Sequence, residues 1–210
     1  MATKPALTRD SIAAAALDLL DRDGLDSLSM RRLADELGVG TMTLYGYFAS
    51  KDELLDAVMD ASVLEAGALP AGRTWRERAA ALARAIRTNL ERHPALVQIR
   101  LGRPMTRPRQ FVWTEAVLAA LVDSGLPRDE AARAFRVLFT YVFGFVAFSP
   151  TAAVDESRAG LRAALDALPP ADYPVLASMV DEAVDAAAGD EQFDFGLELL
   201  LDGIEARVGG

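Results

Sequence analysis

The side chains best suited to recognition chemistry lie between residues 31 and 51. One arginine, two threonines, a methionine, two tyrosines and a lysine gather there: Arg31, Thr41, Met42, Thr43, Tyr45, Tyr47 and Lys51. The arginine fork matches the edge of guanine, and threonine can meet a base edge or a thymine methyl group. Tyrosine and lysine can hold phosphate oxygens. These residue types at this spacing indicate contacts with a nucleic acid duplex.

Two short helices around a glycine turn are predicted to position these side chains. Leu33 and Leu37 stand at helical spacing, and Gly38-Val39-Gly40 ends that helix. In the second helix Leu44 and Phe48 lie four residues apart on one side, which leaves the polar and aromatic positions outside the core. This is the plan of a helix-turn-helix, whose second helix enters the DNA major groove.

The flanking helices begin at capping signals. Thr8 is the predicted N-cap of a helix that ends near Gly24. Ser50 and Glu53 are predicted to form a capping box, in which each side chain accepts a hydrogen bond from the other residue's amide. Lys51 then lies at a helix N-terminus, where the backbone amides and the dipole already favour an anion such as a DNA phosphate.

The first 60 residues resemble the tetracycline-repressor (TetR) family of bacterial transcriptional regulators. The resemblance is carried by LSMRRLADELGV (28–39) and TLYGYFASKDELL (43–55). It implies that Arg31 meets a guanine and that Thr41, Thr43 and Tyr47 occupy the recognition helix. It also implies that Tyr45 and Lys51 hold phosphates. The alternative is a small helical trio that packs against something other than DNA.

Composition narrows the remaining classes. The 210 residues are 51% apolar, with one histidine and no cysteine, so a sizeable core is expected and a thiolate or Cys-type metal site is excluded. No phosphate-binding glycine loop or paired-carboxylate motif is present, which argues against an enzyme. No apolar run is expected to span a membrane and no signal peptide is seen, so a cytoplasmic protein without a cofactor is predicted.

The charge predicts selective rather than general DNA binding. Net charge is −9, and residues 1–66 hold 6 Lys/Arg against 12 Asp/Glu. Non-specific binding draws its affinity from basic patches, so random DNA should bind poorly. A particular operator can still bind tightly if the few cations gather on the DNA side. Those cations are Lys4, Arg9, Arg31, Arg32 and Lys51.

The rest of the chain also predicts helices, which makes the fold all-α. We expect a helix-turn-helix domain over 1–66, with a connecting helix from residue 50, and a larger helical domain over 67–210. In the second domain the Thr74–Glu77 capping box opens a helix that ends at His93-Pro94. A short helix near 96–99, a loop over 100–108 and three further helices follow. The three helices are expected at about 109–124, 128–149 and 191–207.

The helix at 128–149 is apolar on nearly every side and therefore has to be buried on every side. A dimer partner and an apolar ligand cavity are the two explanations, and both can hold. The ending FDFGLELLLDGIE (193–205) resembles the C-terminal domain of the tetracycline-repressor subgroup, which implies a four-helix dimer interface. The predicted interface residues are Phe135, Tyr141, Phe145, Phe193, Leu197, Leu200, Leu201 and Ile204.

The same resemblance exposes one departure. Tetracycline repressors carry a metal-binding histidine where this chain has Arg100, before Leu101-Gly102, and arginine cannot ligate a cation. No metal and no magnesium–tetracycline effector are therefore expected. The arginines of residues 100–109 are either a solvated loop that neutralises an acidic chain or, at Arg100 or Arg103, a clamp for a carboxylate or phenolate. The candidate pocket residues are His93, Arg100, Arg103, Phe111, Trp113, Phe139 and Phe143.

Together these features predict a homodimeric, ligand-responsive repressor of palindromic operator DNA, with an unidentified small-molecule effector. An activator or an effector-independent DNA-binding protein would share the same fold. A third hypothesis, from a different functional class, is a carrier of apolar ligands with a vestigial DNA-binding domain.

Overall fold

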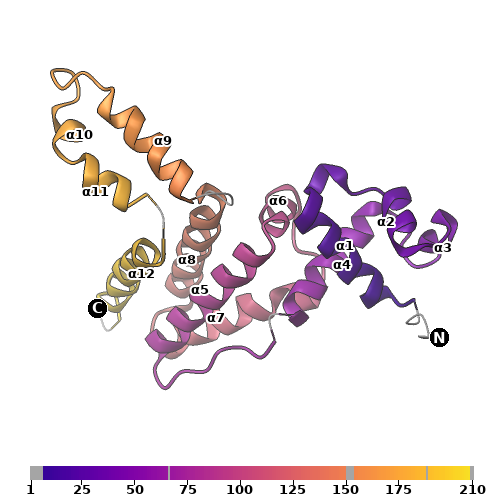
Figure 1. The fold of residues 1–210 in the computed structure, drawn as a ribbon. Coiled ribbons are helices and arrows are strands. Elements are labelled where there is room, and N and C mark those ends of the chain that lie inside the picture. Colours follow the sequence, from indigo (N-terminus) through magenta and orange to yellow (C-terminus); the bar gives the residue numbers. More distant parts are fainter. Residues whose placement is uncertain (1–6, 66, 150–153, 188, 209–210) are drawn as a thin grey trace.

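The computed structural model describes residues 7–65, 67–149, 154–187 and 189–208, and within these ranges every regular element is a helix. Figure 1 shows helices α1 to α4 at one end of the molecule and the longer helices α5, α7, α8 and α12 at the other. The all-α prediction is confirmed.

The N-terminal end is built on α1 (Arg9–Asp23) and α4 (Lys51–Glu65), with α2 (Met30–Leu37) and α3 (Thr41–Tyr45) at the tip. A short 3-10 turn, η1 (Leu25–Ser27), joins α1 to α2. Thr8 caps α1 in a capping box with Ser11, as expected of a hydroxyl at that position. Leu33, Leu44 and Phe48 are fully buried in the small core beneath the tip.

Gly38 makes the turn between α2 and α3. Its φ of 64° and ψ of 41° are left-handed, a conformation that costs a side-chain-bearing residue about 1 kcal/mol or more. Ser29 caps the other end of α2 by accepting a hydrogen bond from the Arg32 amide. These two local signals fix the length of α2 and the direction in which α3 leaves the turn.

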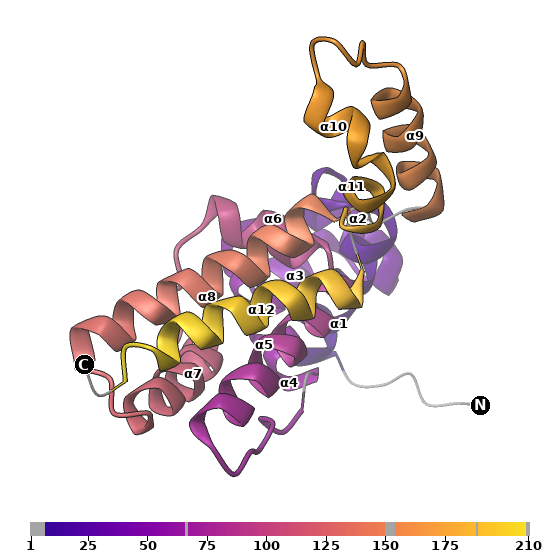
Figure 2. The same cartoon turned by 90° about the vertical axis from the view of Figure 1, so that its left-hand side faces the viewer.

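The larger end contains α5 (Trp75–Arg92), α6 (Ala95–Gly102), η2 (Pro108–Phe111), α7 (Val112–Asp123), α8 (Arg128–Phe148) and α12 (Asp190–Glu205). Helices α5, α7 and α8 pack against one another, and α12 lies along α8 and α5 (Figure 2). The Thr74–Glu77 capping box forms as predicted. The helix expected at 109–124 is instead a 3-10 turn followed by α7.

Ion pairs with α5 and a close contact between Gly196 and Tyr141 of α8 hold α12 in place. Arginines of α5 bind its acidic edge, with Arg76 bonded to Glu198 at 2.6 Å and Arg84 to Asp194 at 2.8 Å. On the adjacent face, a Cβ at Gly196 would lie 2.7 Å from Cζ of Tyr141, so glycine lets α8 come this near. Such pairs contribute little individually, and the buried leucines of α12 supply most of its attachment.

An arm between α8 and α12 was not anticipated from the sequence. It consists of α9 (Val154–Asp166), α10 (Pro174–Ser178) and α11 (Val180–Asp185), which contact mainly one another and project away from the bundle (Figures 1 and 2). Its alanine-rich sequence has no strong apolar stripe, and Val175 is exposed.

Helix α8 departs from two expectations. By length and composition it could cross a membrane, although no apolar run of that length was expected. In the structure it packs against α5, α7 and α12 instead. It is also not buried on every side within one chain, because Val137 and Phe148 are exposed.

Candidate nucleic-acid interface and effector cavity

The exposed face of α3 carries the predicted base-reading residues at the far tip of the molecule (Figure 1). Leu44 points into the core, which turns Met42, Thr43 and Tyr45 outward. Met42 is 80% exposed and Tyr45 46% exposed, while Thr41 at the start of the helix is half-buried. The helix therefore presents a mixed polar and apolar face that no other described part of the chain covers.

Arg31 and Lys51 are the cations of this tip that have no ion pair within the described residues. Arg32 is bound to Asp23 at 2.6 Å, and Arg9 to Glu53 at 2.7 Å. Lys4 lies outside the described ranges. Of the predicted basic cluster, Arg31 on α2 and Lys51 at the start of α4 thus remain available to an external anion.

Two expectations at this tip are corrected. Tyr47 lies beyond the end of α3 and is half-buried, because its hydroxyl donates a hydrogen bond of 3.0 Å to the carbonyl of Leu7. Glu53 accepts its capping bond from the Ala49 amide rather than from Ser50, although Ser50 accepts from the Glu53 amide as predicted. The Ala49 amide and Arg9 together hold the pKa of Glu53 below its ordinary value.

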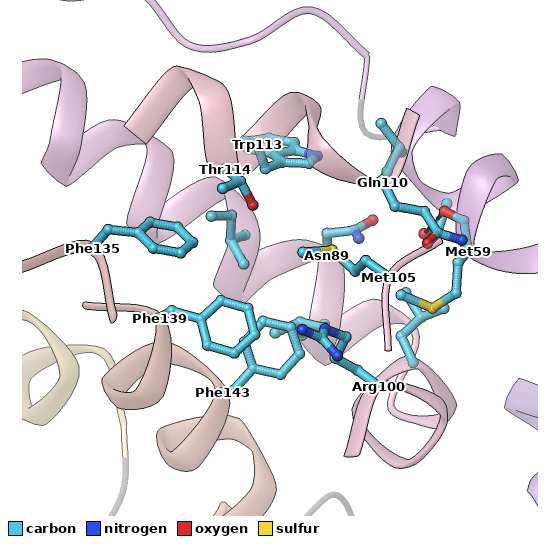
Figure 3. A pocket seen from close by; sticks show the side chains of 15 residues that line it. Met59, Asn89, Arg100, Met105, Gln110, Trp113, Thr114, Phe135, Phe139 and Phe143 are labelled. Carbon is cyan, nitrogen blue, oxygen red and sulfur yellow. Dashed lines mark hydrogen bonds between the residues drawn. The ribbon is translucent and has the colours of Figure 1, made fainter. Parts of the chain in front are cut away.

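A cavity opens where α4, α5, α6, α7 and α8 meet (Figure 3). Phe135, Phe139 and Phe143 form one wall, and Trp113 lies across from them. Its free volume is about 80 Å³. The lining residues are Met59, Ser62, Val63, Ile86, Asn89, Leu90, Leu96, Arg100, Met105, Gln110, Trp113, Thr114, Phe135, Phe139 and Phe143.

Of the seven predicted pocket residues, Arg100, Trp113, Phe139 and Phe143 line this cavity, and three do not. His93 is buried at the junction with the N-terminal helices, where Nδ1 lies 2.6 Å from Asp21. Phe111 is 43% exposed on η2. Arg103 turns away to α4. Its guanidinium bonds Asp52, which draws the side chain out of the cavity.

The segment from Arg103 to Gln110 runs along α4 as a strap. Besides the Arg103–Asp52 pair, Arg107 binds Asp60 at 3.1 Å. Gln110 is buried, and its Oε1 accepts a hydrogen bond of 3.0 Å from the Thr106 amide. Its Nε2 lies 3.4 Å from a backbone carbonyl of α4. Met105 and Gln110 line the cavity, so the same segment touches both the cavity and the helix that follows the recognition helix.

Four of the eight predicted dimer residues are buried in the core of their own chain: Phe193, Leu197, Leu201 and Ile204. Phe193, Leu197 and Leu201 are fully buried in their own chain, and so cannot contact a partner. Phe135 lines the cavity. Tyr141 donates to the Phe193 carbonyl at 2.7 Å, and the Phe145 ring packs edge-on against Phe193. The interface prediction is therefore wrong for Phe193, Leu197 and Leu201. For the half-buried Phe135, Tyr141 and Phe145 it stays a prediction.

A different stripe of α12 faces outward beside α8. Leu199 is 57% exposed, and with Leu200, Ile204 and Val137 it lines a groove between the two helices. Leu200 and Ile204 are the two predicted interface residues that reach this groove. Figure 2 looks directly on to α8 and α12, which lie side by side with no other helix covering them in that view.

These features define the class of the protein: a helix-turn-helix DNA-binding protein with a cavity where α4 meets the larger helical part of the chain. Two sequence families match it. "Bacterial regulatory proteins, tetR family" matches residues 12–58, and "Tetracyclin repressor-like, C-terminal domain" matches residues 68–208. The chain therefore belongs to the TetR family of bacterial transcriptional regulators.

Individual relatives are similar to this chain over nearly its whole length. An HTH-type transcriptional regulator of Saccharopolyspora erythraea is 37% identical, with 99% of this chain and 88% of the relative covered. The HTH-type transcriptional repressor DrrR1 of Streptomyces coeruleorubidus is 36% identical over 98% of this chain and 80% of its own length. The structure of the TetR family protein ActR of Streptomyces coelicolor in complex with actinorhodin has a TM-score of 0.81 at 31% identity. The match covers 98% of this chain and 100% of ActR.

Proposed function

We propose that this regulator is a homodimeric repressor that binds palindromic operator DNA through α3 and is released when a small molecule occupies the cavity. The observation that carries the proposal is the strap from Arg103 to Gln110, because it joins the cavity wall to the helix that positions the recognition helix. The relative named as a repressor and the similar structure that holds actinorhodin support repression and an effector. The protein acts in the cytoplasm, on the DNA that it regulates.

On DNA, α3 lies in the major groove with Thr41, Met42 and Thr43 toward the bases. Arg31, the arginine of α2 that has no ion pair in the described part of the chain, reaches a guanine edge. Tyr45 and Lys51 flank these residues and hold phosphates, which set the position of the helix without reading sequence. The part played by Tyr47 is to tie the segment after α3 to Leu7 rather than to read a base.

The dimer forms through the α8–α12 groove. Val137 on α8 and Leu199 on α12 are exposed and line this groove, and Phe195, also exposed, lies one helical turn before Leu199. Exposed apolar side chains that gather on one face mark an interaction surface. A twofold interface places the same patch of each protomer against its copy, so one apolar surface is sufficient. Pairing α8 and α12 with their copies gives four helices and leaves both α3 helices free.

Effector binding has to enlarge the cavity. Its free volume of about 80 Å³ is below the roughly 150 Å³ that accommodates one benzene ring in an engineered protein cavity. Met59, Ser62 and Val63 of α4 form part of the wall, and Met105 belongs to the strap. A ligand therefore displaces elements that hold α4, and α4 sets the spacing of the two recognition helices. Operator and effector then weaken each other by the same factor.

Selection of preferred duplexes from a random DNA pool tests this function. We expect recovery of a palindrome whose half-sites are separated by about 10 base pairs or a multiple of that distance, one helical turn of DNA. Random DNA should bind poorly because the N-terminal region is acidic. If the folded protein enriches no sequence, the repressor function is overturned and the protein is a ligand carrier that has lost DNA binding.

The strap gives a separate prediction. In the double variant Arg103→Gln, Arg107→Gln, a compound selected for releasing the wild-type protein from its operator should still bind. It should lose most of its effect on DNA affinity. Coupling between sites is typically 1–3 kcal/mol, so a fall of about fivefold or more in the coupling factor is expected. Operator affinity with and without that compound, together with its affinity for the free protein, gives the factor.

Arg109→Gln is the matched control, because Arg109 belongs to the same segment, is exposed, and forms no ion pair within the described residues. It should leave the coupling factor unchanged. Full coupling in the double variant would show that the strap plays no part in transmission.

A further inference from the structure

Of the described residues that line the cavity one is charged, and that charge is not balanced. Arg100 is half-buried, and no carboxylate lies within ion-pair distance of it in the part of the chain that the structure describes. Among the described residues its one hydrogen bond, 2.8 Å from Nη1, goes to the Arg103 carbonyl, and its Nε is buried without a partner there. A desolvated cation without a counter-charge costs free energy, and a bound anion would recover it.

The neighbours of Arg100 increase this deficit. Burial and the nearby Arg136 lower the pKa of Arg100, which means that the surroundings disfavour its positive charge. Two other arginines of the same segment differ, since Arg103 and Arg107 both bind carboxylates of α4. The structure thus separates the two readings of this arginine cluster. Arg103 and Arg107 neutralise α4, and Arg100 remains uncompensated beside the cavity.

The walls around Arg100 favour a flat aromatic body. Its guanidinium lies 5.4 Å from the centroid of the Phe139 ring, and Phe139 stacks on Phe143 with centroids 4.3 Å apart (Figure 3). Trp113 lies on the opposite side. A second void of about 20 Å³, between α5, α7 and α8, is lined by the same phenylalanines. Aromatic rings pack well in offset or edge-on arrangements against such walls.

Asn89 supplies a second polar contact. Its Oδ1 is buried at the cavity and accepts no hydrogen bond from any residue that the structure describes. An unmet acceptor in a buried position favours a ligand that brings a donor such as a hydroxyl. Gln110, by contrast, already uses its side-chain oxygen within the strap.

We propose that the effector is an aromatic acid whose carboxylate pairs with Arg100, whose rings lie against Phe139, Phe143 and Trp113, and whose hydroxyl, where it has one, donates to Asn89. The inference rests on the proposed function, because it names the ligand class of the same cavity. Under this proposal, neutral polycyclic compounds and straight-chain fatty acids bind the cavity more weakly than an aromatic acid does.

The test compares three probes by isothermal titration calorimetry: 2-naphthoate, its neutral analogue 2-naphthamide, and decanoate. Wild-type protein should bind 2-naphthoate about tenfold or more tighter than 2-naphthamide, since hydrogen bonds to charged groups exceed neutral ones by about that factor. In Arg100→Gln the two should bind within about twofold of each other. Arg109→Gln is the control. Arg109 belongs to the same arginine-rich segment but is exposed and does not line the cavity, so the preference should remain.

Each of the other outcomes of this titration overturns one named part of the proposal. Equal binding of naphthoate and naphthamide to the wild type, or a preference that survives in Arg100→Gln, overturns the role of Arg100 and leaves the cavity as the effector site. Binding of decanoate as tight as that of naphthoate overturns the aromatic requirement. If no probe binds to protein that still recognises its operator, the inference fails together with the cavity as effector site, while the DNA-binding function stands.

Discussion

Alanine at both Tyr45 and Lys51 should reduce operator affinity about 1,000-fold while leaving the fold and the dimer intact. Each lost contact is worth roughly 1 kcal/mol, and a dimer loses it at both half-sites, so the four contacts sum to about 4 kcal/mol. Each single variant should cost about 30-fold. Tyr45 is 46% exposed and Lys51 has no ion pair within the described residues, so neither supports the core.

The salt dependence identifies which kind of contact is lost. Lys51→Ala should weaken binding to every sequence alike and lower the slope of log affinity against log salt by about 2 per dimer, one phosphate in each half-site. Arg31→Ala should instead relax the preference for one base pair in each half-site. Fluorescence anisotropy with the selected operator, measured over a series of salt concentrations, separates the two.

Arg32→Ala is the matched control, because Arg32 adjoins Arg31 but is held by Asp23 at 2.6 Å. It should change operator affinity by less than about threefold, because an exposed ion pair such as Arg32–Asp23 contributes well under about 1 kcal/mol. Operator binding by Tyr45→Ala and Lys51→Ala at the wild-type level would remove α3 and the start of α4 from the DNA interface.

The recognition tip was predictable from the sequence because its signals are local. Ser29, Gly38 and Leu44 each act within one or two turns of helix: a cap, a left-handed turn and a core anchor. Once Leu44 is assigned to the core, the helical period alone turns Met42 and Tyr45 outward. Tyr47 was misplaced because its partner, the Leu7 carbonyl, lies 40 residues away.

The larger domain was predicted less well because its decisive contacts are not local. Arg100 and Arg103 look alike in sequence, and only the position of α4 shows that Asp52 is within reach of Arg103 and not of Arg100. Helix α12 carries two apolar stripes, and the helical period cannot tell which one faces the protomer's own core. Buried Leu197 and exposed Leu199 differ by only two positions along the same helix.

The two stripes of α12 should respond to substitution in opposite ways. Leu197→Ala removes a fully buried side chain, and we expect it to lower the free energy of unfolding by about 2–5 kcal/mol. Leu199→Glu places a charge on the exposed stripe beside the groove. It should convert the dimer to a folded monomer, because an unpaired charge in an apolar interface costs several kcal/mol and occurs twice per dimer. Denaturant unfolding and sedimentation equilibrium measure the two effects.

Leu101→Glu controls for the added charge, since Leu101 is 75% exposed on α6, away from α12. It should leave both unfolding and dimerisation unchanged. The monomer produced by Leu199→Glu should also lose the palindromic operator, because one α3 alone reads one half-site and both half-sites are needed for tight binding. A stable Leu199→Glu dimer that still binds the operator would exclude the groove between α8 and α12 as the interface. It would also require the two recognition helices to be joined through another surface of the chain.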